Sequence, residues 1–326
     1  MSNVNNYLNG PDLELILFIA NNVFPVFLII GLGFALRKIN LINANFCTIA
    51  NQLIFMVALP AFIFAEMLKM DVRKAFDFNL IGYVYLGTFA TVFLAWITGK
   101  ILKAKDSDFG AFIQGSYRGN LAIIGLALIG NVGGTIALGK AAIVLAFVMP
   151  LYNVIAIVVL SFYSTSSNSG MYKKVLKDIA VNPLMIALVL GFVFSLARIT
   201  LPAIAQTTVN YLASLSLPLA LIGIGGSLSR ENLIKSKRFA VIAASLKLVA
   251  APVILTLIAY QLGFRGYDLL VIYISFGAPT AIVSYVMAES MGGNGGLASS
   301  VILITTFFSV LTISAAVFVM KALGLF

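Results

Sequence analysis

Two basic side chains lie inside long apolar stretches of this sequence, where a charge is costly. Arg118 stands in one such stretch and Lys247 in another. Insertion scales put the cost of a central Arg or Lys at about 3 kcal/mol. A guanidinium can hold a carboxylate through two parallel hydrogen bonds. We therefore expect Arg118 to bind an anion or to act in gating. The structural alternative is that it pairs with a protein carboxylate or with exposed backbone carbonyls.

The surroundings of Arg118 are unfavourable for a continuous helix. It lies in a polar run, residues 116–120, with glycines on both sides, and a second unfavourable run covers residues 277–280, Gly-Ala-Pro-Thr. In hydrocarbon an interrupted helix is tolerated only where it is buried or lines a cavity, and two corresponding interruptions point to a substrate site. Helices that start after Asn120 and after Pro279 would direct positive dipole ends at the crossing, which suits an anion. We expect Arg118, Gly119, Asn120, Tyr152, Asn153, Pro279, Thr280 and Ser284 at the substrate site, with Gly125 beside the crossing.

Four of the polar residues in apolar stretches each allow two interpretations. Tyr152 and Asn153 follow Pro150, and they either face a cavity or hydrogen-bond to a neighbouring helix. Lys247 is either a counter-charge that holds the crossed helices or a titrating group that couples transport to an ion. Glu289 is either a gate or ion ligand, or an exposed residue at a helix end.

The composition lacks residue types that many enzymes use for catalysis. The sequence has no histidine and one cysteine, Cys47, so an internal disulfide, a Ser-His pair and the commonest zinc ligand are all excluded. The membrane stretches also lack a pair of aspartates that could act in intramembrane proteolysis. We therefore expect no enzyme activity, no metal and no cofactor.

The composition is that of an integral membrane protein. Hydrophobic residues make up 61% of the chain, charged residues 10%, and the mean hydropathy is +1.06. A membrane helix needs about 20 apolar residues. We place ten spans at 16–36, 46–67, 79–99, 110–130, 138–162, 182–200, 207–228, 238–262, 267–291 and 297–322.

The net charge of +10 follows membrane topology rather than a nucleic-acid site. With ten spans and an external N-terminus, the loops after spans 1, 3, 5 and 7 hold twelve Lys or Arg residues, against six on the other side. Because basic loops stay in the cytoplasm, we expect a plasma (inner) membrane protein with both termini outside.

The ten spans form two sequence repeats. The stretch that starts at Pro25 recurs at Pro183, and Pro60 recurs as Pro218, each at an offset of 158 residues. Both Pro60 and Pro218 fall mid-span, where proline kinks or breaks a helix. We divide the chain into a first repeat (1–163), a polar linker (164–181) and a second repeat (182–326). Five spans per repeat would make the second repeat inverted relative to the first.

These motifs resemble the auxin efflux carrier family, which includes plant auxin exporters and bacterial organic-acid transporters. The resemblance covers nearly the whole chain, and its motifs are Phe55 to Ala61, Arg118 to Asn120, Pro150 to Asn153, Leu217 to Leu221 with Gly225-Gly226, and Ala278 to Thr280 with Ser284-Tyr285. The resemblance implies a scaffold of spans 1, 2, 6 and 7, often dimeric, and a transport part of spans 3–5 and 8–10, with spans 4 and 9 broken and crossing. It also implies that Asn120 and Pro279 lie at the crossing, and that Tyr152 lines the cavity. The plant exporters' long loop between spans 5 and 6 is absent here.

Our leading hypothesis is a secondary transporter that moves small organic anions, mono- or dicarboxylates, by alternating access. The alternatives are a Na⁺ or H⁺ exchanger of similar design, which would need buried carboxylates at the break, and a membrane receptor without transport. The expected partners are the anion, the lipid bilayer and a second copy of the chain in a homodimer. A coupling ion, Na⁺ or H⁺, stays open at this point.

Overall fold

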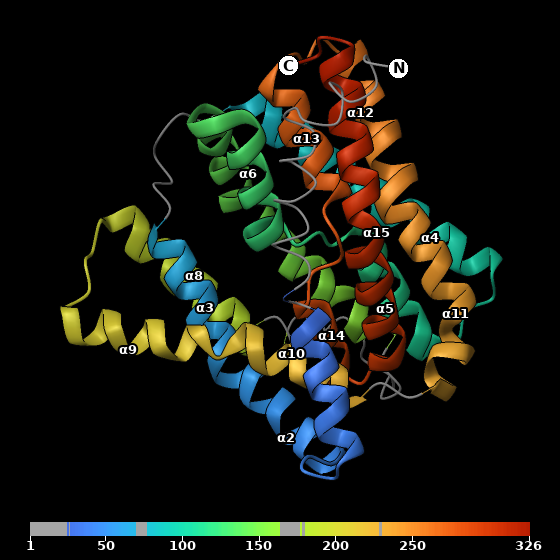
Figure 1. Cartoon of the computed structure of the whole chain (residues 1–326). Helices are drawn as coiled ribbons and strands as arrows, with labels where there is room; N and C mark the ends of the chain where they lie inside the picture. Colours follow the sequence, from blue (N-terminus) through green and yellow to red (C-terminus); the bar gives the residue numbers. More distant parts are fainter. Residues whose placement is uncertain (1–24, 26, 70–76, 164–176, 178–179, 228–229) are drawn as a thin grey trace, which may run out of the picture.

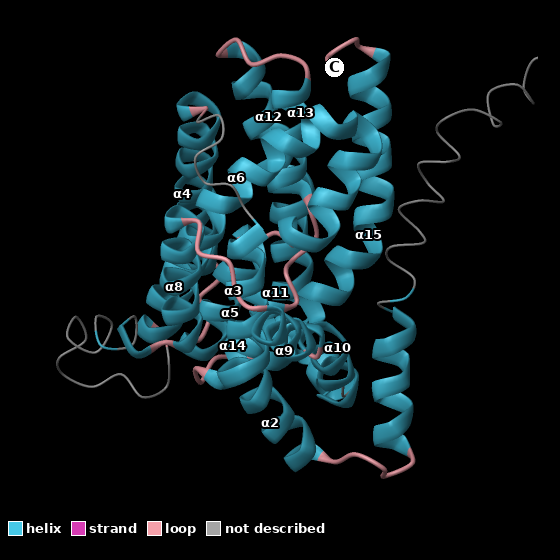
Figure 2. Cartoon of the chain, turned by 90° about the vertical axis from the view of Figure 1, so that its left-hand side faces the viewer, coloured by secondary structure: helices cyan, strands magenta, loops and turns pink. Residues whose placement is uncertain are grey.

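The structure is a computed structural model that describes residues 25, 27–69, 77–163, 177, 180–227 and 230–326. Over these residues the chain is helical with connecting loops, as Figure 2 shows. Six helices are long and apolar enough to cross a membrane, namely Ala44–Lys69, Phe78–Ile101, Leu121–Phe162, Ala203–Gly226, Lys237–Gln261 and Gly295–Ala322. Pro183–Ala197 and Tyr267–Gly277 are shorter apolar helices. The all-helical, membrane-type fold that the sequence predicts is therefore confirmed, while the ten-span inverted repeat stays a prediction. Most of the predicted linker, 164–181, lies outside the described residues.

The described helices follow the chain in this order (Figure 1). Residues 27–38 are helical, followed by α2 (Ala44–Leu53), α3 (Leu59–Lys69), α4 (Phe78–Ile101), α5 (Asp106–Tyr117), α6 (Leu126–Phe162), α8 (Pro183–Ala197), α9 (Ala203–Ser214), α10 (Ser216–Ser227), α11 (Arg230–Ser245), α12 (Ala251–Gln261), α13 (Tyr267–Gly277), α14 (Val283–Ser290) and α15 (Gly295–Ala322). Three π-helical turns stand among them: η1 (Ile54–Ala58), η2 (Leu121–Gly125) and η3 (Leu246–Ala250).

Two of the π-turns end two residues before a proline. In η1 the residue before Pro60, Leu59, donates its amide to Ile54, and in η3 Ala251 before Pro252 donates to Leu246. A widened turn accommodates the missing proline N–H while the helix continues. Pro60 thus lies inside the uninterrupted run from α2 to α3; of the kink or break that the sequence predicts, a break is not found there.

Pro218 has a different setting. The seventh predicted span is divided at Leu215, between α9 and α10, and Pro218 is the third residue of α10. In the first turn of a helix an amide has no intrahelical acceptor, so proline costs no hydrogen bond there. Pro218 therefore lies mid-span in the run Ala203–Gly226, in the first turn after the irregularity at Leu215.

The long helix α6 contains parts of two predicted spans. Gly134, with φ 65° and ψ −160°, divides it into two helical segments. A positive φ of this kind is readily adopted only by glycine. The first segment continues the fourth predicted span, and the second segment corresponds to the fifth.

The outer surface carries many large apolar side chains. Phe93, Leu257 and Phe308 are each roughly half exposed, and the wholly described helix α9 has no buried residue. An apolar exterior is the arrangement expected where lipid replaces water. In Figure 1, α9 runs across the view while α15 stands upright, and α3 packs against both α8 and α9.

Candidate functional site

The two predicted interruptions meet in space and pair with each other. Helix α5 ends at Tyr117, and α13 ends at Gly277. Beyond these ends the extended segments form an antiparallel bridge between Gly119 and Thr280. The Asn120 amide donates to the Pro279 carbonyl at 2.7 Å, and the Ala281 amide donates to the Arg118 carbonyl at 3.0 Å. These bonds replace helical ones, so the helices cross without leaving these backbone groups unpaired.

Arg118 is buried at this crossing and is held by neutral groups. Its side chain is 4% exposed. Nη2 donates to Asn153 Oδ1 at 2.6 Å, and Nη1 lies 2.8 Å from the sulfur of Met287. When the Gln114 carboxamide is turned so that its oxygen faces Arg118, that oxygen also accepts from Nη1 at 3.2 Å. Among the described residues no carboxylate forms an ion pair with Arg118.

Lys247 is the second buried cation of the crossing. It is 1% exposed, and its Nζ donates to the carbonyls of Phe276 at 2.7 Å and of Tyr117 at 3.2 Å. Both carbonyls belong to the last turn of a broken helix, where the helix dipole places negative charge. Lys247 therefore contacts both crossed helices.

A cavity of about 590 Å³ lies against one side of the crossing. Its wall combines residues of α3, the crossing, α6, the α9–α10 junction and the start of α14. Most lining side chains are apolar, among them Phe62, Leu145, Met149 and Val286. The volume falls in the range of about 300–1,000 Å³ that is usual for small-molecule sites.

Five of the residues singled out in the sequence line this cavity: Arg118, Gly119, Asn120, Tyr152 and Pro218. Asn120 is 6% exposed, and its carboxamide makes no hydrogen bond to any described residue. Its backbone oxygen, in contrast, accepts from the amides of Ile124 and Gly125. The Asn120 carboxamide is thus a polar group of the wall with no partner among the described residues.

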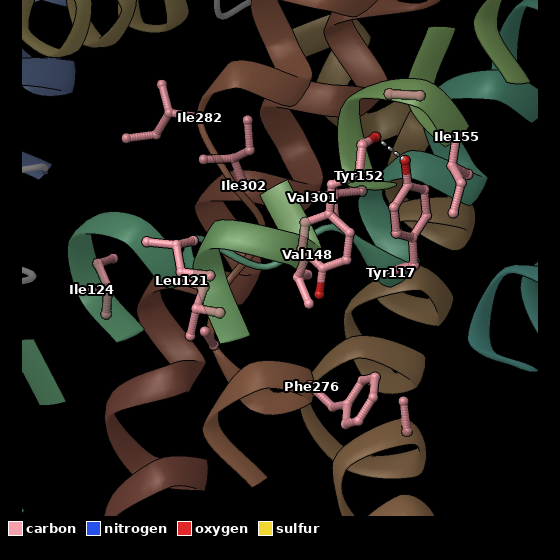
Figure 3. Close-up of a cluster of buried hydrophobic side chains, with 14 of the residues drawn as sticks. Tyr117, Leu121, Ile124, Val148, Tyr152, Ile155, Phe276, Ile282, Val301 and Ile302 are labelled. Carbon is pink, nitrogen blue, oxygen red and sulfur yellow. Dashed lines mark hydrogen bonds between the residues drawn. The ribbon is translucent and has the colours of Figure 1, made fainter. Parts of the chain in front are cut away.

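Tyr152 contributes to both the cavity and the packing behind it. Its backbone oxygen accepts from the Tyr117 hydroxyl at 3.0 Å, and the two rings meet edge to face at 5.5 Å (Figure 3). Its own hydroxyl is buried and has no hydrogen-bond partner among the described residues. The ring therefore anchors α6 to α5 next to the crossing.

The other residues singled out surround the site without lining the cavity. Asn153 and Ser284 are fully buried behind Arg118, and Thr280 donates through Oγ1 to the Gly115 carbonyl at 2.7 Å. Pro279 accepts the Asn120 amide, and Gly125 closes the π-turn η2. Neither Pro60 nor Lys247 lines the cavity, and Glu289 stands exposed near the end of α14. Their predicted roles toward substrate, coupling or gating stay predictions.

Several lining residues were not found by sequence reasoning. Glu66 and Lys69 form an ion pair of 2.7 Å at the end of α3, and both line the cavity. Ser216 also lines it, and its buried hydroxyl has no hydrogen-bond partner within the described part of the chain. A small polar residue beside a proline, as in Ser216-Leu217-Pro218, was the available signal for Ser216.

Comparisons of the sequence with known proteins place this chain in a family. Residues 18–317 match the family model described as membrane transport protein. An uncharacterized transporter of Methanocaldococcus jannaschii is 25% identical over 299 residues, which cover 90% of this chain and 96% of that protein. A Rhizobium meliloti protein named "Putative malonate transporter" is 25% identical over 314 residues, which cover 92% of this chain and 95% of that protein. The chain therefore belongs to the membrane transport protein family, the auxin efflux carrier family that its motifs resemble.

Proposed function

We propose that this membrane transporter moves small organic anions, mono- or dicarboxylates, through the cavity beside the helix crossing. The observation that carries the proposal is the buried Arg118, which lines the cavity and whose side-chain hydrogen bonds go to neutral groups among the described residues. An ion buried without a counter-charge is costly. A bound carboxylate would offset that cost, and the nearby Lys247 adds a second positive charge.

The polar groups of the cavity wall suit an anion with a hydrophobic or neutral remainder. The carboxylate would lie at Arg118 and at the N-terminal ends of the half-helices that follow Asn120 and Pro279. The Asn120 carboxamide and the Ser216 hydroxyl would donate further hydrogen bonds, since both lack protein partners in the described chain. The name of the Rhizobium meliloti relative supports a carboxylate substrate.

For the transport cycle we propose alternating access in a fold of two inverted five-span repeats. Spans 1, 2, 6 and 7 would form a scaffold, and the remaining spans would move against it as a unit that carries the crossing. The cavity lies between elements of both groups, because α3, α9 and α10 face α6 and α14 across it. We further propose that the protein is a homodimer in the plasma membrane, with both termini outside.

Uptake into proteoliposomes tests the proposal. A panel of labelled carboxylates (malonate, malate, succinate, lactate and an indole acid) is offered to wild type and to Arg118→Ala. We expect saturable uptake of at least one acid by wild type, and a loss of about 10–100-fold in the variant, the worth of a charge-assisted hydrogen bond. The matched control is Arg198→Asn, at an exposed helix end. Unchanged uptake by folded Arg118→Ala would overturn the proposal.

A further inference from the structure

The broken helices present two backbone carbonyls to each other at the crossing. Tyr117 is the last residue of α5, and Phe276 is the next-to-last residue of α13. Because each helix stops here, neither carbonyl has the amide donor that a continuing helix would supply. In transporters with discontinuous helices, carbonyls of this kind coordinate the coupling Na⁺ or take part in H⁺ coupling.

In this chain a side chain already occupies that position. The Nζ of Lys247 lies 2.7 Å from the Phe276 oxygen and 3.2 Å from the Tyr117 oxygen. Lys247 comes from η3, on a separate helix, so its ammonium joins three helices at one point. The group is 1% exposed and, among the described residues, forms no ion pair with a carboxylate.

The ammonium is tightly packed against the backbone of the crossing at Gly119. A Cβ placed on Gly119 would stand 3.0 Å from Lys247 Nζ, 3.1 Å from the Ser275 oxygen and 3.5 Å from the Ala278 oxygen. A side chain at position 119 would therefore crowd the lysine, which would have to shift by a few tenths of an ångström. A monovalent cation within a group of carbonyl oxygens is also the arrangement of a sodium site.

We propose that the Lys247 ammonium is a built-in cation that replaces a coupling Na⁺ at the helix crossing. This inference rests on the proposed transport of an organic anion and specifies how that transport is driven. A tethered cation cannot leave the protein with the substrate, so the Na⁺ gradient contributes nothing to accumulation. Its positive charge still stabilises the crossing and favours an anion nearby.

The first test uses the wild-type protein. Thermal unfolding in detergent and uptake in proteoliposomes are measured in NaCl and in choline chloride of equal ionic strength. We expect the same melting temperature and the same uptake rate in both salts. A saturable increase of the melting temperature with Na⁺, or uptake that requires Na⁺, would overturn the inference. The unfolding measurement needs no substrate, so its result is independent of whether the proposed function is correct.

The second test removes the cation. Lys247→Ala leaves a buried gap between the two carbonyls, and we expect a lower melting temperature than in wild type. Methylammonium chloride or NaCl, but not choline chloride, should then raise the melting temperature of Lys247→Ala by about 2–4 °C in a saturable manner. Lys140→Ala, which removes a partly exposed lysine paired with Asp268, is the matched control and should show no such rescue.

Two further variants separate the cation from the packing of the side chain. Lys247→Arg keeps a charge, and Lys247→Met keeps most of the volume without it. We expect the Arg variant to retain more stability than the Met variant. Equal stability of the two, or Lys247→Ala that neither small cation stabilises, would contradict a cation role. If Lys247→Ala does not fold, the wild-type salt comparison decides the question.

Discussion

At the scale of single residues, Asn120 offers the most direct test of the cavity. Its backbone is satisfied within the crossing, while its carboxamide has no partner in the described chain and lines the cavity. Asn120→Ala should therefore leave the melting temperature almost unchanged. Loss of one hydrogen bond to a charged substrate, worth about 1.5–3 kcal/mol, should raise KM by roughly 10–100-fold. Saturation kinetics of uptake measure this, and an unchanged KM would remove Asn120 from the substrate site.

Asn153 should behave in the opposite manner, because its carboxamide serves the protein. Its Oδ1 accepts from Arg118 Nη2 at 2.6 Å, and neither group is exposed. Asn153→Leu would leave a buried guanidinium with one acceptor fewer, at a cost of about 1–3 kcal/mol of unfolding free energy. Thermal unfolding measures the loss.

A double-mutant cycle supplies the control for Asn153. In Arg118→Met the charge is gone. Adding Asn153→Leu to this variant should therefore lower the free energy of unfolding much less than it does in wild type. If the effects of the two substitutions on the free energy of unfolding are additive, Arg118 and Asn153 do not interact in the way that the geometry indicates.

The residues that could be predicted from the sequence are those that violate the apolar pattern. Arg118 and Lys247 were found because charge is rare in a membrane span, and Asn120 because it stands among helix-breaking residues. Glu66 and Lys69 were missed because they lie near the end of an apolar segment, where polar residues are ordinary, and Ser216 because a single serine inside a span is common in helix packing. Only the folded chain brings them to the same cavity as Arg118.

At the scale of helices, the contact between residues 27–38 and α10 depends on two glycines. A Cβ on Gly33 would collide with the backbone of Ile222, and one on Gly225 with the carbonyl of Ile30. Small residues permit this close approach of helix backbones in a membrane. Gly33→Ala should therefore lower the unfolding free energy by about 1–3 kcal/mol.

Gly31 provides the matched control in the same helix. A Cβ on Gly31 would have nothing within 4 Å, so Gly31→Ala should be neutral or slightly stabilising. Chemical unfolding of the two variants beside wild type checks the difference. Equal changes in unfolding free energy in Gly31→Ala and Gly33→Ala would mean that residues 27–38 do not pack on α10 as described.

The helix interruptions were predictable, whereas the π-turns were not. Glycine, proline and polar residues at 115–120 and 277–280 mark the two breaks, and each break was found at the expected place. Pro60 carries the same sequence signal but lies in a continuous run, because η1 supplies an alternative hydrogen bond. Proline alone does not distinguish a π-turn from a break; the packing of the neighbouring helices decides.

At the scale of the whole molecule, a buried polar contact joins the scaffold helices to the group of helices that we expect to move against them. Asn51 in α2 donates to the Tyr285 hydroxyl at 3.0 Å, and that hydroxyl donates to the Gly223 carbonyl of α10 at 3.2 Å. On the same helix α14, Val286 lines the cavity. These bonds therefore stabilise the arrangement in which the cavity between α3, α9 and α14 is formed.

Tyr285→Phe tests whether this contact sets the conformational balance. It removes two hydrogen bonds, each worth about 1 kcal/mol, so the population of the observed arrangement should fall severalfold relative to others.

The readout for Tyr285→Phe is the rate at which a membrane-impermeant thiol reagent labels Ala213→Cys, at a position that lines the cavity. Since Cys47 is the chain's one cysteine, Cys47→Ser supplies a clean background. We expect labelling to slow about 3–10-fold in Tyr285→Phe and to stay constant in Tyr211→Phe, whose side chain is exposed. Unchanged labelling together with unchanged uptake would show that the contact only packs the helices, and the energy that separates the transport states would then lie elsewhere in the interface.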